Sequence, residues 1–490
     1  MCREVHQDGD TGQAAATCLL SPEPNKDGEF MSKAKDWYRR RTYSHFDRPL
    51  SREQAQTLVE SPEAVARHAF WPVIINPQKT VSIKKDPIKG DRVYHTKSRP
   101  IAFSAHSDAH IYAYYAQKLN EKLEAVYEEL DGAPHVLAYR QFEPAKSNIH
   151  FAFDAFKEIR DKKECDVIAI DVEGFFDGLD HQVLKSAWSK LLGETYLPKD
   201  HYAVYRACTH DSAITVPVLR DLFGGEIRRR AGREGQAICT PKEFRSVVKP
   251  HLRSRHELVW KVKRKTPPVN KTGIPQGLPI SAVLANLYMF EPDNEILQSI
   301  KELGGSYRRY SDDILLILPK GKGKQGEIII EDALKKVNLN IQPKKTKRNR
   351  FIQHKGELKS FELDKHYTLG VQKPASYLGF SFDGQNIRVR NSTISRFMIK
   401  AKRAIERAEI AAEKNKTGFI KKRQLYARLT SIGYGNAYGK GIYNSLNDGV
   451  LPKGAPRLGF FKYLKLAHKV MGSGVIVKSG VRHQATFLSD

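Results

Sequence analysis

Two apolar stretches, far apart in the chain, predict strands that each adjoin acidic residues. Residues 166–171 read Asp-Val-Ile-Ala-Ile-Asp and end on a carboxylate. Residues 314–318, Ile-Leu-Leu-Ile-Leu, follow the quartet Tyr-Ser-Asp-Asp at 310–313, which predicts a hairpin with two adjacent acids at its tip. Such acids repel each other, and a divalent cation such as Mg²⁺ stabilises them because it prefers oxygen ligands. Asp171 can share this cation only if the two strands are neighbours.

The remaining periodicity is helical. Apolar residues recur at helical spacing in residues 111–123, 151–160 and 282–290, which predicts amphipathic helices. From Asn391 a further helix is expected, with apolar residues on one face and basic residues on the other. A basic face of this kind either lies along a nucleic-acid backbone or is simply solvated, and the pattern does not separate the two.

Composition changes along the chain. Residues 1–30 are polar, rich in glycine and proline and without periodicity, which predicts a disordered leader. Residues 195–270 contain a Gly-Gly pair, three consecutive arginines and a basic run at 261–265. We interpret them as an insertion that contacts nucleic acid or a second copy of the chain, with a solvated basic loop as the alternative.

The charge balance points to a polyanionic partner. The 490 residues include 82 Lys and Arg against 55 Asp and Glu, a net charge of +27, which favours nucleic acid over an anionic membrane. No apolar run approaches the roughly 20 residues that a membrane span needs, so we expect a soluble, cytoplasmic protein. Five cysteines without a Cys-x-x-Cys pair fit a reducing compartment and argue against a zinc site or a disulfide framework.

Two further stretches carry candidate chemistry. Residues 272–281 form a loop in which glycine permits close approach and Gln276, beside Gly277, offers a donor and an acceptor where a nucleotide would lie. Residues 84–101 are basic and predict a hairpin that aims Arg99 at a triphosphate, since a guanidinium binds phosphate oxygens in a fork. A plain strand edge is the alternative for Arg99.

Taken in chain order over residues 84–415, these motifs resemble those of the reverse transcriptases. The matching elements are Arg-Pro-Ile at 99–101, Asp171 with Phe176 five residues later, Pro-Gln-Gly at 275–277, Tyr-Ser-Asp-Asp at 310–313, Lys-Thr at 345–346 and Tyr-Leu-Gly-Phe at 377–380. The nearest likeness is to bacterial enzymes of the retron, group II intron, abortive-infection and unknown-group, defence-associated kinds. Phrases similar to the last group occur at 43–47, 104–112, 137–140 and 240–245, whereas retron hallmarks are absent.

The resemblance implies an α+β, right-hand polymerase. Residues 31–165 would form an N-terminal extension and the fingers, and residues 166–390 the palm with an antiparallel sheet and the insertion. Residues 391–490 would form a helical, basic thumb and a C-terminal tail. The implied activity is RNA-directed DNA synthesis, the addition of dNTPs to a 3′-hydroxyl, on an associated non-coding RNA that serves as template and scaffold in antiphage defence. A homo-oligomer is compatible with this reading.

The resemblance also assigns roles to individual residues. Asp171 and Asp312 would hold two Mg²⁺ ions, or Mn²⁺ as an alternative, with Asp313 in support and a ligand from the carbonyl of Val172. The expected substrate contacts are Arg99 and Lys345 at the phosphates, Phe176 as the steric gate against a ribose, and Gln276 with Gly277 around the nucleotide. The primer grip would be Tyr377, Leu378, Gly379 and Phe380. The sequence departs from many relatives at Leu278 and Ser311.

Three alternatives remain open. One is a retron or intron-type reverse transcriptase of a mobile element. Another is a template-independent or protein-primed DNA polymerase, for which Tyr434, Tyr438 and Tyr443 are candidate primers. The third is a catalytically silent RNA-binding or structural protein, against which the intact set of three acids argues.

Overall fold

The structure is a computed structural model that describes residues 36–41, 43–85, 92–130, 134–142, 144–210, 212–224, 237–263, 272–415, 419–420 and 460–471. The predicted leader at 1–30, the three candidate priming tyrosines and part of the basic insertion lie outside these residues. Among the described helices, none is long and apolar enough to cross a membrane.

A six-stranded sheet carries the acidic residues and has the strand order β10-β9-β8-β3-β7-β6. Every pairing in it is antiparallel, as the resemblance implies for a palm. The strands are β3 (Cys165–Asp171), β6 (Ser306–Tyr310), β7 (Asp313–Pro319), β8 (Lys347–His354), β9 (Glu357–Leu363) and β10 (Leu369–Gln372). Both predicted strands therefore exist, and they are direct neighbours.

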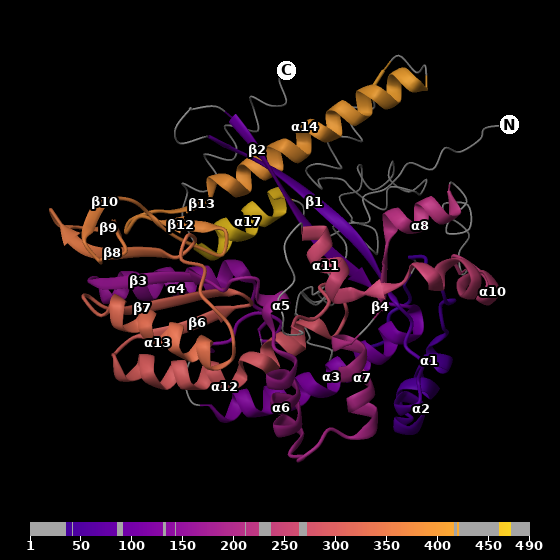
Figure 1. Cartoon of the computed structure of the whole chain (residues 1–490). Coiled ribbons are helices and arrows are strands. Elements are labelled where there is room, and N and C mark those ends of the chain that lie inside the picture. The colour runs from indigo at the N-terminus through magenta and orange to yellow at the C-terminus, as the bar shows by residue number, and fades with distance from the viewer. Residues whose placement is uncertain are drawn as a thin grey trace, which may run out of the picture.

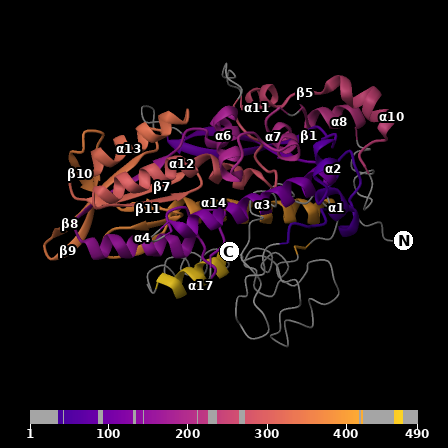
Figure 2. The same ribbon diagram turned by 90° about the horizontal axis from the view of Figure 1, so that it is seen from below.

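Helices cover both faces of this sheet, which explains why its central strands are continuously apolar. Figure 2 shows α12 (Ser281–Glu302) and α13 (Gly323–Lys336) on one side of β7 and α4 (Asn148–Lys162) on the other. Successive residues of β7 alternate between the two cores, with Leu316 on the α12 side and Leu315 and Ile317 on the α4 side. The predicted helices at 151–160 and 282–290 lie within α4 and α12.

A second sheet, of order β2-β1-β4-β5, is built on the long antiparallel hairpin of β1 (Val73–Lys85) and β2 (Arg92–Phe103). The strand β4 (Ser212–Thr215) runs parallel to β1, and β5 (Arg253–Ser254) pairs with β4. Both short strands belong to the predicted insertion, so its described part folds onto the fingers hairpin. Its helical elements are α7 (Lys199–Thr209), α8 (Val216–Phe223), α10 (Pro241–Glu243), the turns Phe244–Val248 and Lys249–His251, and α11 (Arg255–Lys263).

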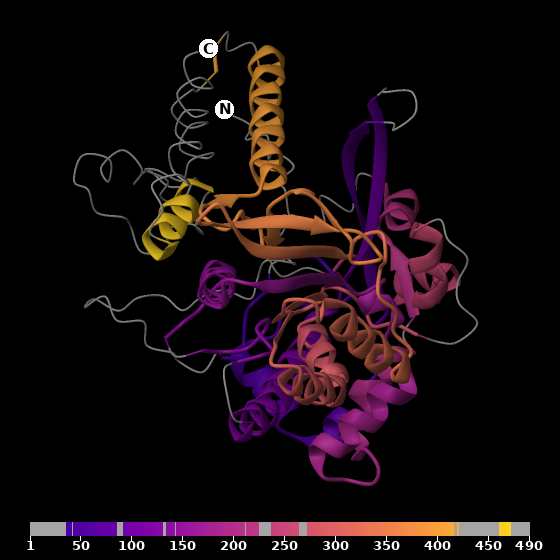
Figure 3. The same ribbon diagram turned by 90° about the vertical axis from the view of Figure 1, so that its left-hand side faces the viewer.

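The other elements frame these two sheets (Figure 1). The N-terminal part contributes α1 (Arg52–Val59), α2 (Pro62–Ala66) and α3 (His106–Glu129), and α5 (Phe175–Gly178) and α6 (His181–Leu192) follow β3. A small sheet of β11 (Ala375–Tyr377), β12 (Phe380–Phe382) and β13 (Ile387–Val389) leads into α14 (Asn391–Lys414), which begins at the predicted residue. The last described helix is α17 (Phe460–Met471). In Figure 3, α14 (orange) and the β1–β2 hairpin (indigo) rise on the same side of the palm sheet.

Candidate active site

The hairpin of β6 and β7 places the acidic quartet beside the end of β3. Tyr310 pairs with Asp313 across the hairpin, and Ser311 turns the chain with a left-handed φ of 60°. Asp171 pairs in register with Asp313, and directly opposed residues of an antiparallel pair share one face of the sheet. The backbone N–H of Val172 donates to the carbonyl of Asp312 at 3.1 Å. The three acids thus meet at one end of the palm sheet.

Burial, with a further contribution from repulsion between carboxylates, raises the pKa values of Asp312 and Asp313. Loss of water around the carboxyl raises the pKa of Asp313 to about 6, and the negative charges of Asp312 and Asp171 add to the effect. Burial likewise raises the pKa of Asp312, with a further contribution from Asp171. A group of carboxylates that resists ionisation is a group that a bound cation stabilises.

Basic side chains surround Asp171. The Nζ atom of Lys345 lies 2.5 Å from its Oδ1 atom. Burial and the neighbouring positive charges of Arg99 and Lys345 lower the pKa of Lys97, whereas Asp171 acts in the opposite direction. The predicted phosphate ligands Arg99 and Lys345 are therefore brought together. Lys97 was missed, although its position two residues before Arg99 puts both side chains on the same face of β2.

The Pro-Gln-Gly loop packs directly against β2. The backbone N–H of Ala102 donates to the carbonyl of Gln276 at 2.7 Å. Gly277 has φ of 115°, and a Cβ atom there would lie 2.6 Å from the carbonyl oxygen of Ala102. Only glycine permits this approach, which fixes the loop beside the strand that carries Arg99.

Phe176 lies between β3 and this loop. It belongs to α5, where Phe175 is buried in the core, as expected, and Phe176 is half-buried. The carbonyl of Phe176 accepts from the N–H of Ile274 at 2.9 Å. An ion pair between Asp177 and Lys263 joins α5 to α11 of the insertion.

A buried polar network lies behind the acidic turn. Arg309 and Asp293 are both fully buried, and the guanidinium donates to the two carboxylate oxygens at 2.8 and 2.6 Å. The same guanidinium donates to the backbone carbonyl of Ser311 at 3.2 Å, and Asn286 of α12 accepts from it as well. The turn is therefore held from inside by α12. Sequence reasoning missed Asp293, because it lies in the polar stretch Glu-Pro-Asp-Asn-Glu at 291–295, which gives no local sign that this one acid is buried.

The four predicted primer-grip residues divide into two groups. The side chains of Tyr377 and Phe380 are buried in the core beneath the palm sheet. Leu378 and Gly379 form the turn between β11 and β12, with φ values of 43° and 92°. Asn148 of α4 donates to the carbonyl of Leu378 at 3.1 Å, which fixes this turn against α4.

The donor set at the sheet end fits magnesium, because it consists of carboxylate oxygens and backbone carbonyls. In the part of the chain that the structure describes, no group of three or more His, Cys, Asp or Glu residues is close enough together to hold a metal ion. Asp171 instead forms its ion pair with Lys345. The burial and mutual repulsion that raise the pKa values of Asp312 and Asp313, together with the pairing of Asp171 opposite Asp313, support a cation at this place.

Comparisons with solved structures give distant similarities. Apo telomerase from Candida tropicalis, truncated from its C-terminal domain, has a TM-score of 0.36 and 11% identity over 64% of this chain and 55% of its own. Telomerase from Candida albicans in complex with a TWJ fragment of telomeric RNA has a TM-score of 0.38 and 11% identity over 69% of this chain and 49% of its own. The chain thus spans about half the length of these telomerases. No curated protein sequence matches it.

A family model gives the specific match. Residues 236–382 match the family described as reverse transcriptase (RNA-dependent DNA polymerase). The matched range includes the Pro-Gln-Gly loop, the acidic hairpin and Lys345, whereas Asp171 and Arg99 precede it. The antiparallel palm sheet joins these parts in one fold. Over residues 236–382 the chain therefore carries a reverse transcriptase domain, and its antiparallel palm sheet is that of a right-hand polymerase fold.

Proposed function

We propose that this protein synthesises DNA on an RNA template by extending a 3′-hydroxyl with dNTPs. The observation that carries the proposal is the register of β3 and β7, which sets Asp171 opposite Asp313 of the segment that matches the reverse transcriptase family. In the reaction, the primer oxygen forms a bond to the α-phosphorus of the dNTP. The bond to the leaving pyrophosphate breaks, and the hydroxyl proton is lost to solvent.

The acids hold the reacting groups through metal ions. Asp171, Asp312, Asp313 and the Val172 carbonyl would hold two Mg²⁺ ions, which would supply a lower pKa of the primer hydroxyl and neutralisation of charge on the phosphates. Because Asp171 is paired with Lys345 in the structure, that ammonium has to leave the carboxylate before the site is loaded. It then lies beside the incoming triphosphate.

The remaining residues position the nucleotide and the primer. Lys97 and Arg99 of β2 bind phosphate oxygens, and their shared strand face presents both charges together. Phe176 packs against the deoxyribose and leaves no room for a 2′-hydroxyl, while the Gln276–Gly277 backbone bounds the nucleotide on the fingers side. The turn at Leu378 and Gly379 contacts the primer strand.

We further propose that the template is a dedicated non-coding RNA and that the protein acts in bacterial antiphage defence in the cytoplasm. The motif likeness at 43–47, 104–112, 137–140 and 240–245 supports the defence-associated group. The net charge of +27 supports a stable RNA partner. Sequencing the nucleic acid that co-purifies with the protein tests this part, and a random mixture of cellular RNA would contradict it.

The double variant Asp312→Ala with Asp313→Ala tests the catalytic assignment. It should abolish Mg²⁺-dependent dNTP incorporation on a primed RNA and leave RNA binding nearly intact, because the lost groups are metal ligands. Asp332→Asn, an exposed acid on α13, is the matched control and should keep full activity. Synthesis that persists in the double variant would refute the site.

A further inference from the structure

A cavity of about 710 Å³ lies between α2 and α7, at the opposite end of the molecule from the palm sheet (Figure 1). Its volume is within the range of about 300–1,000 Å³ that small-ligand sites occupy. Cationic and aromatic side chains line it together. The cations are Arg67, Lys199 and Arg206, and the large aromatic residues are Phe70, Trp71 and Tyr202.

The charge of the cavity favours an anion. Two acids also line it, Glu63 and Asp200. Asp200 is buried, and its carboxylate accepts a hydrogen bond from the hydroxyl of Tyr115 at 2.6 Å, on the core side of α7. Among the lining residues, three exposed cations are therefore balanced by one exposed acid, Glu63, which leaves a net positive charge.

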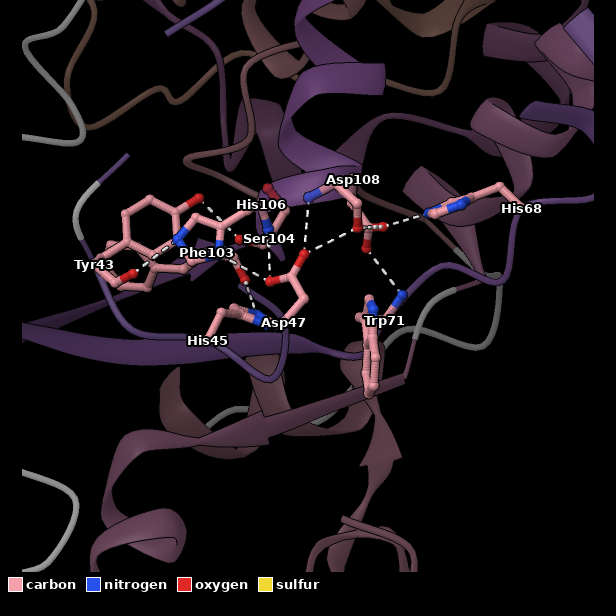
Figure 4. A network of polar contacts seen from close by, with 10 residues as sticks. Tyr43, His45, Asp47, His68, Trp71, Phe103, Ser104, His106 and Asp108 are labelled. Carbon is pink, nitrogen blue, oxygen red and sulfur yellow. Dashed lines mark hydrogen bonds and ion pairs between the residues drawn. The ribbon is translucent and has the colours of Figure 1, made fainter. Parts of the chain in front are cut away.

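One wall of the cavity is fixed by a buried carboxylate. Asp108 of α3 is 1% exposed, and its two oxygens bind Nε2 of His68 at 2.7 Å and the backbone N–H of Trp71 at 2.9 Å (Figure 4). The ring of Phe70 packs edge-on against His68 and stacks on Tyr112. The aromatic wall is therefore held in place before any ligand binds.

The N-terminal segment supports this carboxylate in turn. The residue that precedes α3 is Ala105, whose side chain cannot accept a hydrogen bond from the start of the helix. Asp47, about 60 residues earlier in the chain, caps the helix instead. Its oxygens accept from the backbone N–H groups of His106 and Ser107 at 2.9 and 2.8 Å, and the Ser107 hydroxyl donates to Asp47 and Asp108 (Figure 4). The sequence phrases at 43–47 and 104–112, which the polymerase site does not use, thus build the wall of the cavity.

We propose that this cavity binds a nucleotide unit, with the base stacked on an aromatic ring and the phosphate bound by arginine. Aromatic rings bind bases of any sequence through stacking, and guanidinium groups bind phosphate oxygens in a fork. Tyr202 is 43% exposed; its ring stacks on that of Tyr205, and the Nζ atom of Lys185 lies 5.3 Å from its centroid, so a base that stacks there also meets a positive charge. Arg206 follows one helical turn later on α7.

Two sources supply this chemistry, an unpaired residue of a bound RNA or a free nucleotide. The first alternative rests on the proposed function, because the bound RNA would be the scaffold RNA proposed above. The free-nucleotide source does not depend on it.

Photo-crosslinking tests the site and separates the sources. The full-length protein is irradiated with a 12-nucleotide single-stranded RNA that contains 4-thiouridine, and the crosslinked peptides are identified by mass spectrometry. Separately, binding of AMP is measured by calorimetry. The site variants are Tyr202→Ala and Arg206→Gln, whose side chains are exposed and can be changed without disturbing the core. The controls are Tyr196→Ala, an aromatic side chain that is 80% exposed outside the cavity, and Arg220→Gln on α8.

If RNA is the source, crosslinks form on the peptides of Trp71 or Tyr202. Tyr202→Ala then lowers the yield on the Trp71 peptide about tenfold, the loss of one stacked base, and Arg206→Gln lowers it through the lost phosphate contact. If a free nucleotide is the source, AMP binds, both site variants abolish its binding, and RNA leaves these peptides unlabelled. Absence of both signals, or equal losses in the control variants, would overturn the proposal. Repeating the crosslinking in the Asp312→Ala, Asp313→Ala protein keeps the result independent of polymerase activity.

Discussion

The buried pair Arg309–Asp293 gives the sharpest test of how the acidic turn is held. Both side chains are 0% exposed, and Tyr307 also donates to Asp293 at 2.6 Å. The change Asp293→Asn keeps the shape of the side chain and leaves the guanidinium charge uncompensated. Breaking a buried ion pair by removing one partner costs about 3–5 kcal/mol, so the variant should unfold at a clearly lower temperature and urea concentration than the parent.

A second variant separates stability from positioning. Arg309→Met combined with Asp293→Leu replaces the pair by apolar groups of similar size, which is often neutral or stabilising. Stability should therefore recover relative to Asp293→Asn, and it stays below that of the parent because the buried hydroxyl of Tyr307 loses its acceptor. The carbonyl of Ser311 nevertheless loses the donor that lies 3.2 Å away, a charged hydrogen bond worth about 1.5–3 kcal/mol. We expect kcat for dNTP incorporation to fall at least tenfold while KM for the dNTP changes little.

The assays are urea and thermal unfolding of the full chain and steady-state primer extension. The matched control is Arg308→Met, next in sequence, whose guanidinium pairs with Glu158 on the opposite side of β6 and lies away from the turn. It should reduce stability slightly and leave kcat unchanged. If the double variant regained full kcat together with stability, the network would be structural only, and the positioning argument would fail.

Three further predictions follow from the same site. Phe176→Ala should admit ribonucleotides, and unchanged discrimination between dNTPs and NTPs in primer extension would remove Phe176 from the gate. The pKa of Asp313 is raised above that of an unfolded chain, so its protonated form stabilises the fold at low pH and that contribution is lost as pH rises through about 6. Metal-free Asp313→Asn should therefore be more stable than the parent by about 1 kcal/mol at pH 8, discounted for solvent screening, and equal to it at pH 4 in thermal unfolding. Gly277→Ala should destabilise more than Gly356→Ala, because both have positive φ but only Gly277 lies against another backbone; equal costs measured in urea would contradict this.

The strands that carry the acids were predictable because their signal is local. The runs behind Asp171 and Asp313 are apolar at every position, as strands covered on both faces are, and each has a carboxylate at the end that leaves the core. Asp171 can share a cation with the hairpin only if these two strands are neighbours, and the observed pairing confirms that they are. The start of α14 at Asn391 was predictable for the same reason, because the helical spacing of apolar residues begins there.

The missed features depend on contacts between distant segments. Nothing in residues 212–215 indicates a parallel pairing with β1, because the partner lies about 140 residues earlier in the chain. Asp47 has no local sign of its role as a cap for α3, which begins at His106. Arg308 and Arg309 are adjacent bases of the same type, but alternation along β6 turns Arg308 toward Glu158 and Arg309 toward Asp293. In each case the local pattern is compatible with several partners, and the tertiary fold selects one.

The ion pair between Lys345 and Asp171 connects the two charge patterns of this protein. A chain with net charge +27 gathers three acids at the end of one sheet, where their repulsion would oppose folding without a nearby cation. Lys345, with support from Lys97, supplies positive charge to that end in the metal-free structure. The same two lysines are the groups that a triphosphate attracts, so substrate and metal binding can redistribute the existing cations without bringing in new side chains. In the proposed function, the lysine that pairs with Asp171 in this structure is therefore also a ligand of the triphosphate.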